Sequence, residues 1–113
     1  MANTDDLYKL SFGQHGCSFS DNGSPITPPS GMVIIAIQFL ADNNFTALAA
    51  EDADNGKSWG LTAGHTGAGS GAGSVVIDSS NKFPAGITIF GRWTSATAAA
   101  DADGGIVCYF GPK

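Results

Sequence analysis

Apolar residues are grouped in short segments that are separated by polar or glycine-rich turns. The strongest segments are Met32–Leu40, Phe45–Ala50, Phe83–Trp93 and Gly105–Gly111. Met32–Leu40 is almost continuously apolar and rich in Val and Ile, which is typical of a strand buried on both faces. Alanines in Phe45–Ala50 would also suit a helix, but so short a segment without a good cap favours a strand. The pattern therefore predicts an all-β domain, a small antiparallel β-sandwich or barrel.

The first two segments are predicted to form a hairpin. Ala41–Asn44 supplies the polar residues of a short turn between them. A turn centred there would place Leu40 opposite Phe45 and Ile37 opposite Leu48.

The last two segments are predicted to form a second hairpin around Asp103-Gly104. An Asp-Gly pair between apolar segments favours a type I′ turn, because both residues tolerate positive φ. This turn would place Ala99 opposite Cys108 and Thr97 opposite Phe110. Alternation then predicts one apolar face and one mixed face. The apolar face carries Ile87, Ile89, Trp93, Cys108 and Phe110, and the mixed face carries Thr88, Phe90, Arg92, Thr94, Val107 and Tyr109.

Residues 1–30 are predicted to be a loosely structured N-terminal arm, and residues 31–113 a single β domain with a Gly-rich loop at 64–74. Gly, Ser, Asp, Asn and Pro dominate Gly13–Pro29, and its prolines remove backbone donors. Two interpretations stay open for the arm. It is a partly disordered terminus, or it is an extended segment that becomes ordered by packing on a neighbouring subunit.

Composition changes this picture in two ways. Only 13% of the 113 residues are charged, compared with about 25% in typical globular proteins. A low charge fraction suits a small β protein whose surface is partly covered, for example by a neighbouring subunit. The formal net charge is −5 and the basic residues are scattered, so we expect no direct contact with nucleic acid.

Neither a signal peptide nor a membrane-spanning segment is expected. Met1–Asp6 is polar and acidic, and the longest apolar run, Met32–Ile37, is far shorter than a bilayer requires. Cys17 and Cys108 are predicted to be free, buried thiols rather than a disulfide.

No motif of catalysis, metal binding or cofactor binding is complete. The glycines of 64–73 do not match a dinucleotide fingerprint or a P-loop, and no nucleophile elbow is present. His15 and His65 are both predicted in loops and, with the two cysteines, lack zinc-site spacing. The acidic stretches Glu51–Gly56 and Asp101–Gly105 fail the EF-hand pattern, although an irregular calcium site stays open as an alternative. We therefore expect no catalytic residues, no metal ligands and no cofactor.

The two tryptophans offer one further alternative. Trp93 is placed on the predicted core face, whereas Trp59 lies in a polar loop. Packing is the expected role of both, and an exposed Trp59 that stacks on a sugar is the alternative.

Three stretches of the chain resemble a known group of proteins. They are Pro25–Gly31 with the strand after it, Phe45–Asp52, and Pro84–Ser95, whose most specific part is Gly86-Ile87-Thr88-Ile89-Phe90-Gly91-Arg92-Trp93-Thr94-Ser95. These stretches resemble small virion structural proteins of marine bacteriophages and cyanophages. The resemblance covers about half of the chain and brings no catalytic residues with it.

The resemblance implies a capsid decoration (cement) protein on the outer capsid surface of the virion. Its expected partners are the major capsid protein and copies of itself, without nucleic acid or membrane. The alternatives are a tail, neck or fibre protein of the virion, or a host-surface glycan-binding module. We predict that the contact residues are Tyr8, Leu10 and Phe12 in the arm, Trp59, and Thr88, Arg92 and Thr94 on the mixed face. Arginine is favoured at interfaces, so replacing Arg92 by Ala is expected to weaken assembly and leave the isolated fold intact.

Overall fold

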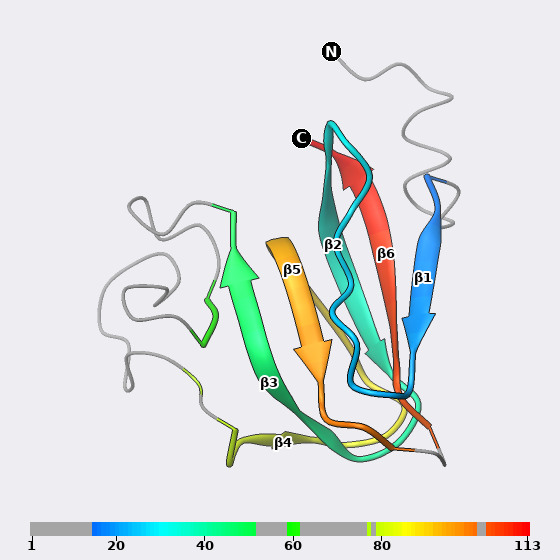
Figure 1. Cartoon of the computed structure of the whole chain (residues 1–113), viewed down its shortest axis with the longest axis vertical. Coiled ribbons are helices and arrows are strands. Elements are labelled where there is room, and N and C mark those ends of the chain that lie inside the picture. Colours follow the sequence, from blue (N-terminus) through cyan, green and yellow to red (C-terminus); the bar gives the residue numbers. More distant parts are fainter. Residues whose placement is uncertain (1–14, 52–58, 62–76, 78, 102–103) are drawn as a thin grey trace.

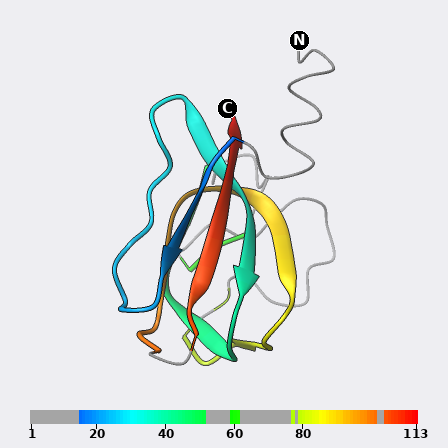
Figure 2. The same cartoon turned by 90° about the vertical axis from the view of Figure 1, so that its right-hand side faces the viewer.

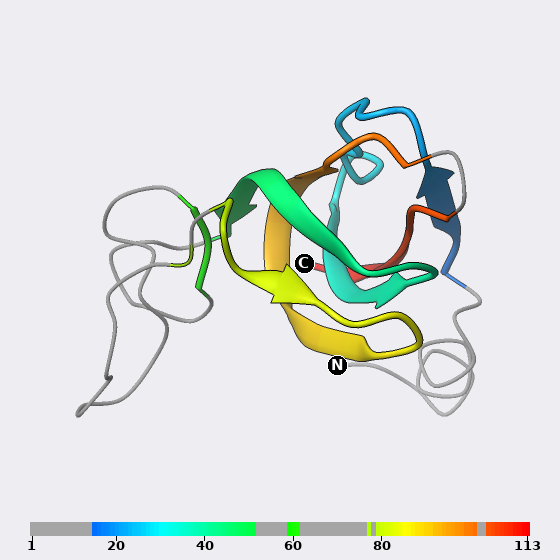
Figure 3. The ribbon, with the colours of Figure 1, turned by 90° about the horizontal axis from the view of Figure 1, so that it is seen from below.

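The computed structural model describes residues 15–51, 59–61, 77, 79–101 and 104–113. Within these residues the chain is all-β, as predicted, with six strands and no helix. Antiparallel pairing joins the strands into one sheet in the order β1-β6-β2-β5-β3-β4, and this sheet curls into a half-barrel (Figures 1 and 3). The strands are β1 (Cys17–Ser20), β2 (Met32–Phe39), β3 (Asn43–Ala50), β4 (Lys82–Phe83), β5 (Thr88–Ala98) and β6 (Ile106–Pro112).

The predicted C-terminal hairpin is wrong, because β2 lies between β5 and β6. Ile37 of β2 is opposite Ile89 of β5 on one side and opposite Cys108 of β6 on the other. The physical reason is the composition of β2. A strand that is apolar on both faces is best buried in the middle of the sheet, and this outweighs a local turn preference.

The predicted hairpin of β2 and β3 is also wrong, although both strands form close to their expected bounds. β3 pairs with β5 and with β4, so β5 separates it from β2. The first part of β5 pairs with β2 and its last part with β3, and Trp93 is opposite both Ile34 and Ala50. Register shifts occur beside Trp93 in both pairings, and such bulges bend a strand. Because β5 bends, its first part pairs with β2 and its last part with β3. Residues 40–42 are then enough to connect β2 to β3.

The core lies inside the curled sheet and has an aromatic centre. Phe83 stacks on Phe39 with ring centroids 4.9 Å apart, and Phe45 meets both rings edge to face. Trp93 is fully buried, and its indole Nε1 donates to the backbone oxygen of Trp59 at 2.7 Å. This bond satisfies the one polar atom of the Trp93 side chain, so the whole indole can be buried without an unpaired donor.

Part of the predicted arm belongs to the sheet. β1 lies beside β6 and pairs with it (Figure 2). Ile26 exchanges two backbone hydrogen bonds with Ala96 of β5, at 2.8 and 3.0 Å. The Ile26 side chain is buried, so residues 17–30 are anchored to the domain rather than loose. Residues 1–14 of the predicted arm and most of the Gly-rich stretch 64–74 lie outside the described residues.

Gly105 makes the close approach of β1 possible. Its φ is +130°, and a Cβ atom there would overlap the backbone oxygen of Ser20 and lie 2.9 Å from the Cα of Asp21. Only glycine adopts this φ readily and leaves this space empty. The residue just before β6 therefore sets how closely β1 can pack.

Candidate interaction surface

One face of the β1, β6, β2 and β5 part of the sheet carries two exposed aromatic rings, and we call it the outer face. Ala36 is opposite both Phe90 and Tyr109, and Gln38 is opposite both Thr88 and Val107. β1 continues these two rows, because Cys17 is opposite Tyr109 and Phe19 is opposite Val107. Opposed residues of paired strands share a face. The outer face therefore consists of Cys17, Phe19, Ala36, Gln38, Thr88, Phe90, Val107 and Tyr109.

The outer face mixes apolar and uncharged polar side chains, and no charged residue is among its members, although the Arg92–Glu51 pair adjoins it on β5. Phe90 is 75% exposed and Phe19 is 55% exposed. Two of the polar side chains between them are bonded to each other, since the Tyr109 hydroxyl donates to Oε1 of Gln38 at 3.0 Å. Exposed aromatic rings on a face without charges mark an interaction site, because water solvates such a surface poorly.

The mixed face predicted from sequence is confirmed in part. Thr88, Phe90, Val107 and Tyr109 do share the outer face, but β2 joins them instead of a hairpin. Arg92 and Thr94 continue the same side of β5 beyond it, on either side of the buried Trp93. The alternation within each segment was sufficient to predict this sharing. The mixed-face prediction did not include Phe19, because the surrounding Gly and Pro residues indicated a loop.

Arg92 has a partner within the chain. Its Nε and Nη2 atoms contact the two carboxylate oxygens of Glu51 at 2.5 and 3.2 Å, and the Glu51 backbone nitrogen donates to the Arg92 oxygen at 2.9 Å. The hydrogen bond to Glu51 raises the pKa of the guanidinium, which therefore stays charged. Thr94 is also used locally, since its hydroxyl donates to the Ala49 oxygen at 3.4 Å. Both residues tie β5 to the end of β3.

Trp59 packs against the core instead of standing alone in a loop. Its ring is parallel to that of Phe83 with centroids 6.0 Å apart, and it meets Trp93 edge to face at 5.5 Å. Phe83 therefore occupies one face of the Trp59 ring, and a sugar would have only the other. The remaining predicted contact residues, Tyr8, Leu10 and Phe12, lie outside the described residues.

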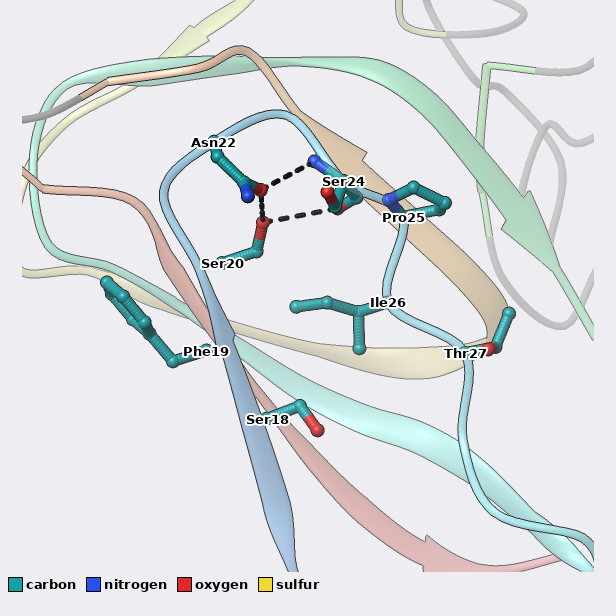
Figure 4. A pocket seen from close by; sticks show the side chains of 8 residues that line it. All are labelled: Ser18, Phe19, Ser20, Asn22, Ser24, Pro25, Ile26 and Thr27. Atoms are coloured by element: carbon teal, nitrogen blue, oxygen red, sulfur yellow. Dashed lines mark hydrogen bonds between the residues drawn. The ribbon is translucent and has the colours of Figure 1, made fainter.

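A hollow of about 350 Å³ lies beside β1 (Figure 4). It is lined by Ser18, Phe19, Ser20, Asn22, Ser24, Pro25, Ile26 and Thr27. The Ser20 hydroxyl donates to the Ser24 oxygen at 3.2 Å, and the Ser24 nitrogen donates to Oδ1 of Asn22 at 3.0 Å. These bonds hold the turn after β1. None of the lining residues is ionisable, so the hollow offers hydrogen bonds but no acid or base.

The two thiols are free, as predicted, but their environments differ. Cys108 is fully buried, and burial raises its pKa to about 12. Cys17 is exposed, contrary to the prediction, because it lies on the outer face at the edge of the sheet. β1 and β6 are neighbours, but Cys17 and Cys108 point to opposite faces of the sheet, so no disulfide can join them.

Candidate ligands for a metal are not brought together in the described part of the chain. No group of three His, Cys, Asp or Glu side chains occurs there. His15 is described and half-buried, whereas His65 and most of the acidic stretch at 51–56 are outside the described residues. In the part of the chain that the structure describes, there is no helix long and apolar enough to cross a membrane.

Comparisons with protein-family models, with curated proteins and with solved structures found no match to this chain. Any functional conclusion therefore depends on the outer face, on the edge of the sheet and on the resemblance within the sequence.

Proposed function

We propose that the chain is a non-enzymatic structural protein of a bacteriophage virion, a decoration protein that binds between major capsid protein subunits on the outer capsid surface. The observation that supports this proposal most is the outer face, with its exposed Phe90 and Phe19 rings and no charged residue. Aromatic residues and few charges are typical of the centres of protein interfaces.

The position of the outer face suits a binding role. It is formed by the edge strand β1 and by β6, β2 and β5 inside the sheet, and the opposite side of these inner strands packs the buried core around Ile37 and Cys108. Strand backbones held in this way lose little further conformational freedom when a partner binds. Phe90 also has few rotatable bonds, so burying it costs little side-chain entropy. A rigid surface of this kind can contribute affinity without any catalytic group.

Most charged residues of the described part of the chain lie away from the outer face, and the pair of Arg92 and Glu51 lies beside it, because Arg92 follows Phe90 by two positions on the same side of β5. The acidic residues are Asp21 after β1, Asp42 between β2 and β3, Glu51 after β3 and Asp101 before β6. A shell protein that meets this face around Phe19 and Phe90 would therefore bury mainly apolar surface, and the adjoining Arg92 and Glu51 already neutralise each other, which lowers the cost of covering them.

The resemblance of Gly86–Ser95 to small phage virion proteins supports the virion context. It leaves open whether the site is the head or the tail. Copy number separates these alternatives, since decoration requires hundreds of copies for each particle and a tail, neck or fibre site only a few. Quantitative mass spectrometry of purified virions therefore tests the proposal, and absence of the chain from virions would reject it.

A paired variant tests the surface itself. Replacing Phe90 by Ser removes the most exposed ring of the outer face, and replacing Leu40 by Ser is the control, because Leu40 is 45% exposed but lies in the connection between β2 and β3. The Phe90 variant should fold normally and lose binding to capsids, whereas the Leu40 variant should still bind. Equal binding by both would show that the outer face is not the capsid contact.

A further inference from the structure

β1 forms one end of the sheet, and its outer edge is unpaired among the described residues (Figures 1 and 2). The Phe110 nitrogen donates to the Gly16 oxygen at 3.0 Å, so Gly16 and Phe110 are a hydrogen-bonded pair. Hydrogen-bonded and non-hydrogen-bonded pairs alternate along antiparallel strands. Ser18 therefore directs its backbone groups toward β6, whereas Cys17 and Phe19 direct their N–H and C=O groups away from the sheet.

The two ends of the sheet are not protected to the same degree. β4 at the opposite end has only two residues, contains Lys82 and is followed by Pro84, and short length, Lys and Pro all block strand addition. β1 has four residues, Cys17-Ser18-Phe19-Ser20, without a charge, a proline or a bulge. Its first three residues are exposed. β1 therefore presents a regular edge that another strand can join.

We infer that β1 pairs antiparallel with β1 of a second copy of this chain, so that two sheets become one across a two-fold axis. The net charge of the chain is the reason for choosing a second copy as the partner of β1. Each copy carries a formal net charge of −5, and two such copies can meet closely only where neither presents a charge. The β1 edge and the adjoining outer face meet this condition. A nucleic acid or a strongly charged protein would find no charged group of opposite sign there.

The hydrogen-bonding pattern favours one register, the one that uses both outward residues of each β1. Cys17 and Phe19 offer the outward backbone groups, so Cys17 of one copy is opposite Phe19 of the other, and the two Ser18 residues face each other at the axis. The Phe19 ring then covers the Cys17 thiol of the second copy, a favourable sulfur–aromatic contact. This arrangement buries the exposed Phe19 and Cys17 side chains together and joins the two outer faces into one surface.

This inference deepens the self-association that the proposed function includes, and purified protein in solution tests it separately from the virion role. The two Ser18 residues form a non-hydrogen-bonded pair with Cα atoms about 4.5 Å apart, within the range of a disulfide. In a Cys17→Ser, Cys108→Ala background, which also removes the thiol opposite residue 18 on β6, Ser18→Cys should therefore form a covalent dimer on mild oxidation. Ser24→Cys in the same background is the control, because Ser24 is exposed beside the hollow but off the strand.

Wild-type protein provides a second test of the register in which the two β1 strands pair. The two Cys17 residues are offset by two positions in this pairing, which places their Cα atoms beyond the limit of about 7 Å for a disulfide. Oxidised wild-type protein should therefore remain without a covalent dimer, although light scattering should report twice the chain mass of 11.4 kDa. Covalent dimers of equal yield for wild type, Ser18→Cys and Ser24→Cys would mean random collision and would overturn the inference.

A blocking variant tests the edge without a new cysteine. Phe19→Pro removes the outward N–H of residue 19, which no bond within the sheet uses, so the monomer should keep its fold. The dimer fraction should fall at least tenfold, with an unchanged circular dichroism spectrum. A dimer that persists in Phe19→Pro, or wild-type protein that is monomeric at all concentrations, overturns the inference. Dimerisation only after removal of residues 1–14 does so as well, since the chain's own N-terminus would then cover the edge. If Phe19→Pro fails to fold, the cysteine series still decides.

Discussion

Replacing Gly105 by Ala should destabilise the protein more than the same change at another glycine of positive φ. Gly105 has φ +130°, and its missing side chain leaves room for the Ser20 oxygen and the Asp21 Cα atom of the segment that follows β1. Gly31 is the matched control. Its φ is +83°, and a Cβ atom there would have nothing within 4 Å.

The expected magnitudes follow from these two environments. A left-handed backbone costs an L-residue about 1–2 kcal/mol, and this term applies to both variants. Forcing a methyl group into occupied space costs about 1–3 kcal/mol more, and only Gly105→Ala incurs it. The contacts that must shift are backbone atoms, which cannot rotate away. We therefore expect Gly105→Ala to lose about 2–5 kcal/mol and Gly31→Ala about 1–2 kcal/mol, against a typical total of about 5–15 kcal/mol.

Urea unfolding at equilibrium measures both losses, and the slope of each transition shows whether the folded states are comparable. The difference between the variants isolates the packing of β1 against the residue before β6. Equal losses, within about 0.5 kcal/mol, would mean that β1 can shift freely and that its position does not depend on Gly105. That result would also weaken the inference of pairing through β1, because the edge would not be rigidly placed.

Three further predictions concern Cys108, Cys17 and the pair of Glu51 and Arg92. The Cys108 pKa is raised from 9.0 to about 12 in the folded protein, so the folded state holds this proton when the unfolded state has lost it. Stability should be unaffected by this thiol below about pH 9 and should fall by about 1.4 kcal/mol per pH unit above it, a slope that urea titrations of Cys108→Ala should lack. At dilutions where the chain is monomeric, a thiol reagent should modify Cys17 of the folded protein at once and Cys108 only on unfolding, and simultaneous labelling of both would contradict the difference in burial. Replacing Arg92 by Ala should destabilise the isolated chain by about 1 kcal/mol, because the partly exposed bidentate pair is lost, and a double-mutant cycle with Glu51→Ala should attribute most of that loss to the pair.

The sequence predicts the strands well and their pairing poorly. β2 is expected at 32–40 and observed at 32–39, and β3 is expected at 45–50 and observed at 43–50. Hydrophobic pattern decides where a strand lies, because burial acts on each segment separately. Pairing depends on which strands can bury one another across the whole fold. The Asp-Gly turn signal carried no information about β2, which takes the place between β5 and β6.

For the surface residues too, local properties could be predicted from the sequence and contacts between distant segments could not. Alternation along β5 and β6 was enough to place Thr88, Phe90 and Tyr109 on one face, since a face is a local property of each strand. The partner of Arg92 could not be predicted, because Glu51 lies 41 positions earlier and approaches only through the bend of β5. β1 was missed because its four residues lie among turn-forming residues, although the alternation Cys17-Ser18-Phe19-Ser20 was a signal for a strand.

The strand order has a consequence for how the chain reaches this fold. Every pairing in the sheet joins one of the first three strands to one of the last three, and the bridge of Ile26 to Ala96 follows the same rule. Among the described residues, neither half of the chain pairs two of its own strands, so the sheet forms only when distant segments meet, which slows folding. During synthesis the apolar β2 emerges long before β5 and β6 and stays without a strand partner until they follow, a period in which it is prone to aggregate. By the same logic, a chain cut between β3 and β4 should yield two pieces that are unfolded alone and that fold only when they are mixed.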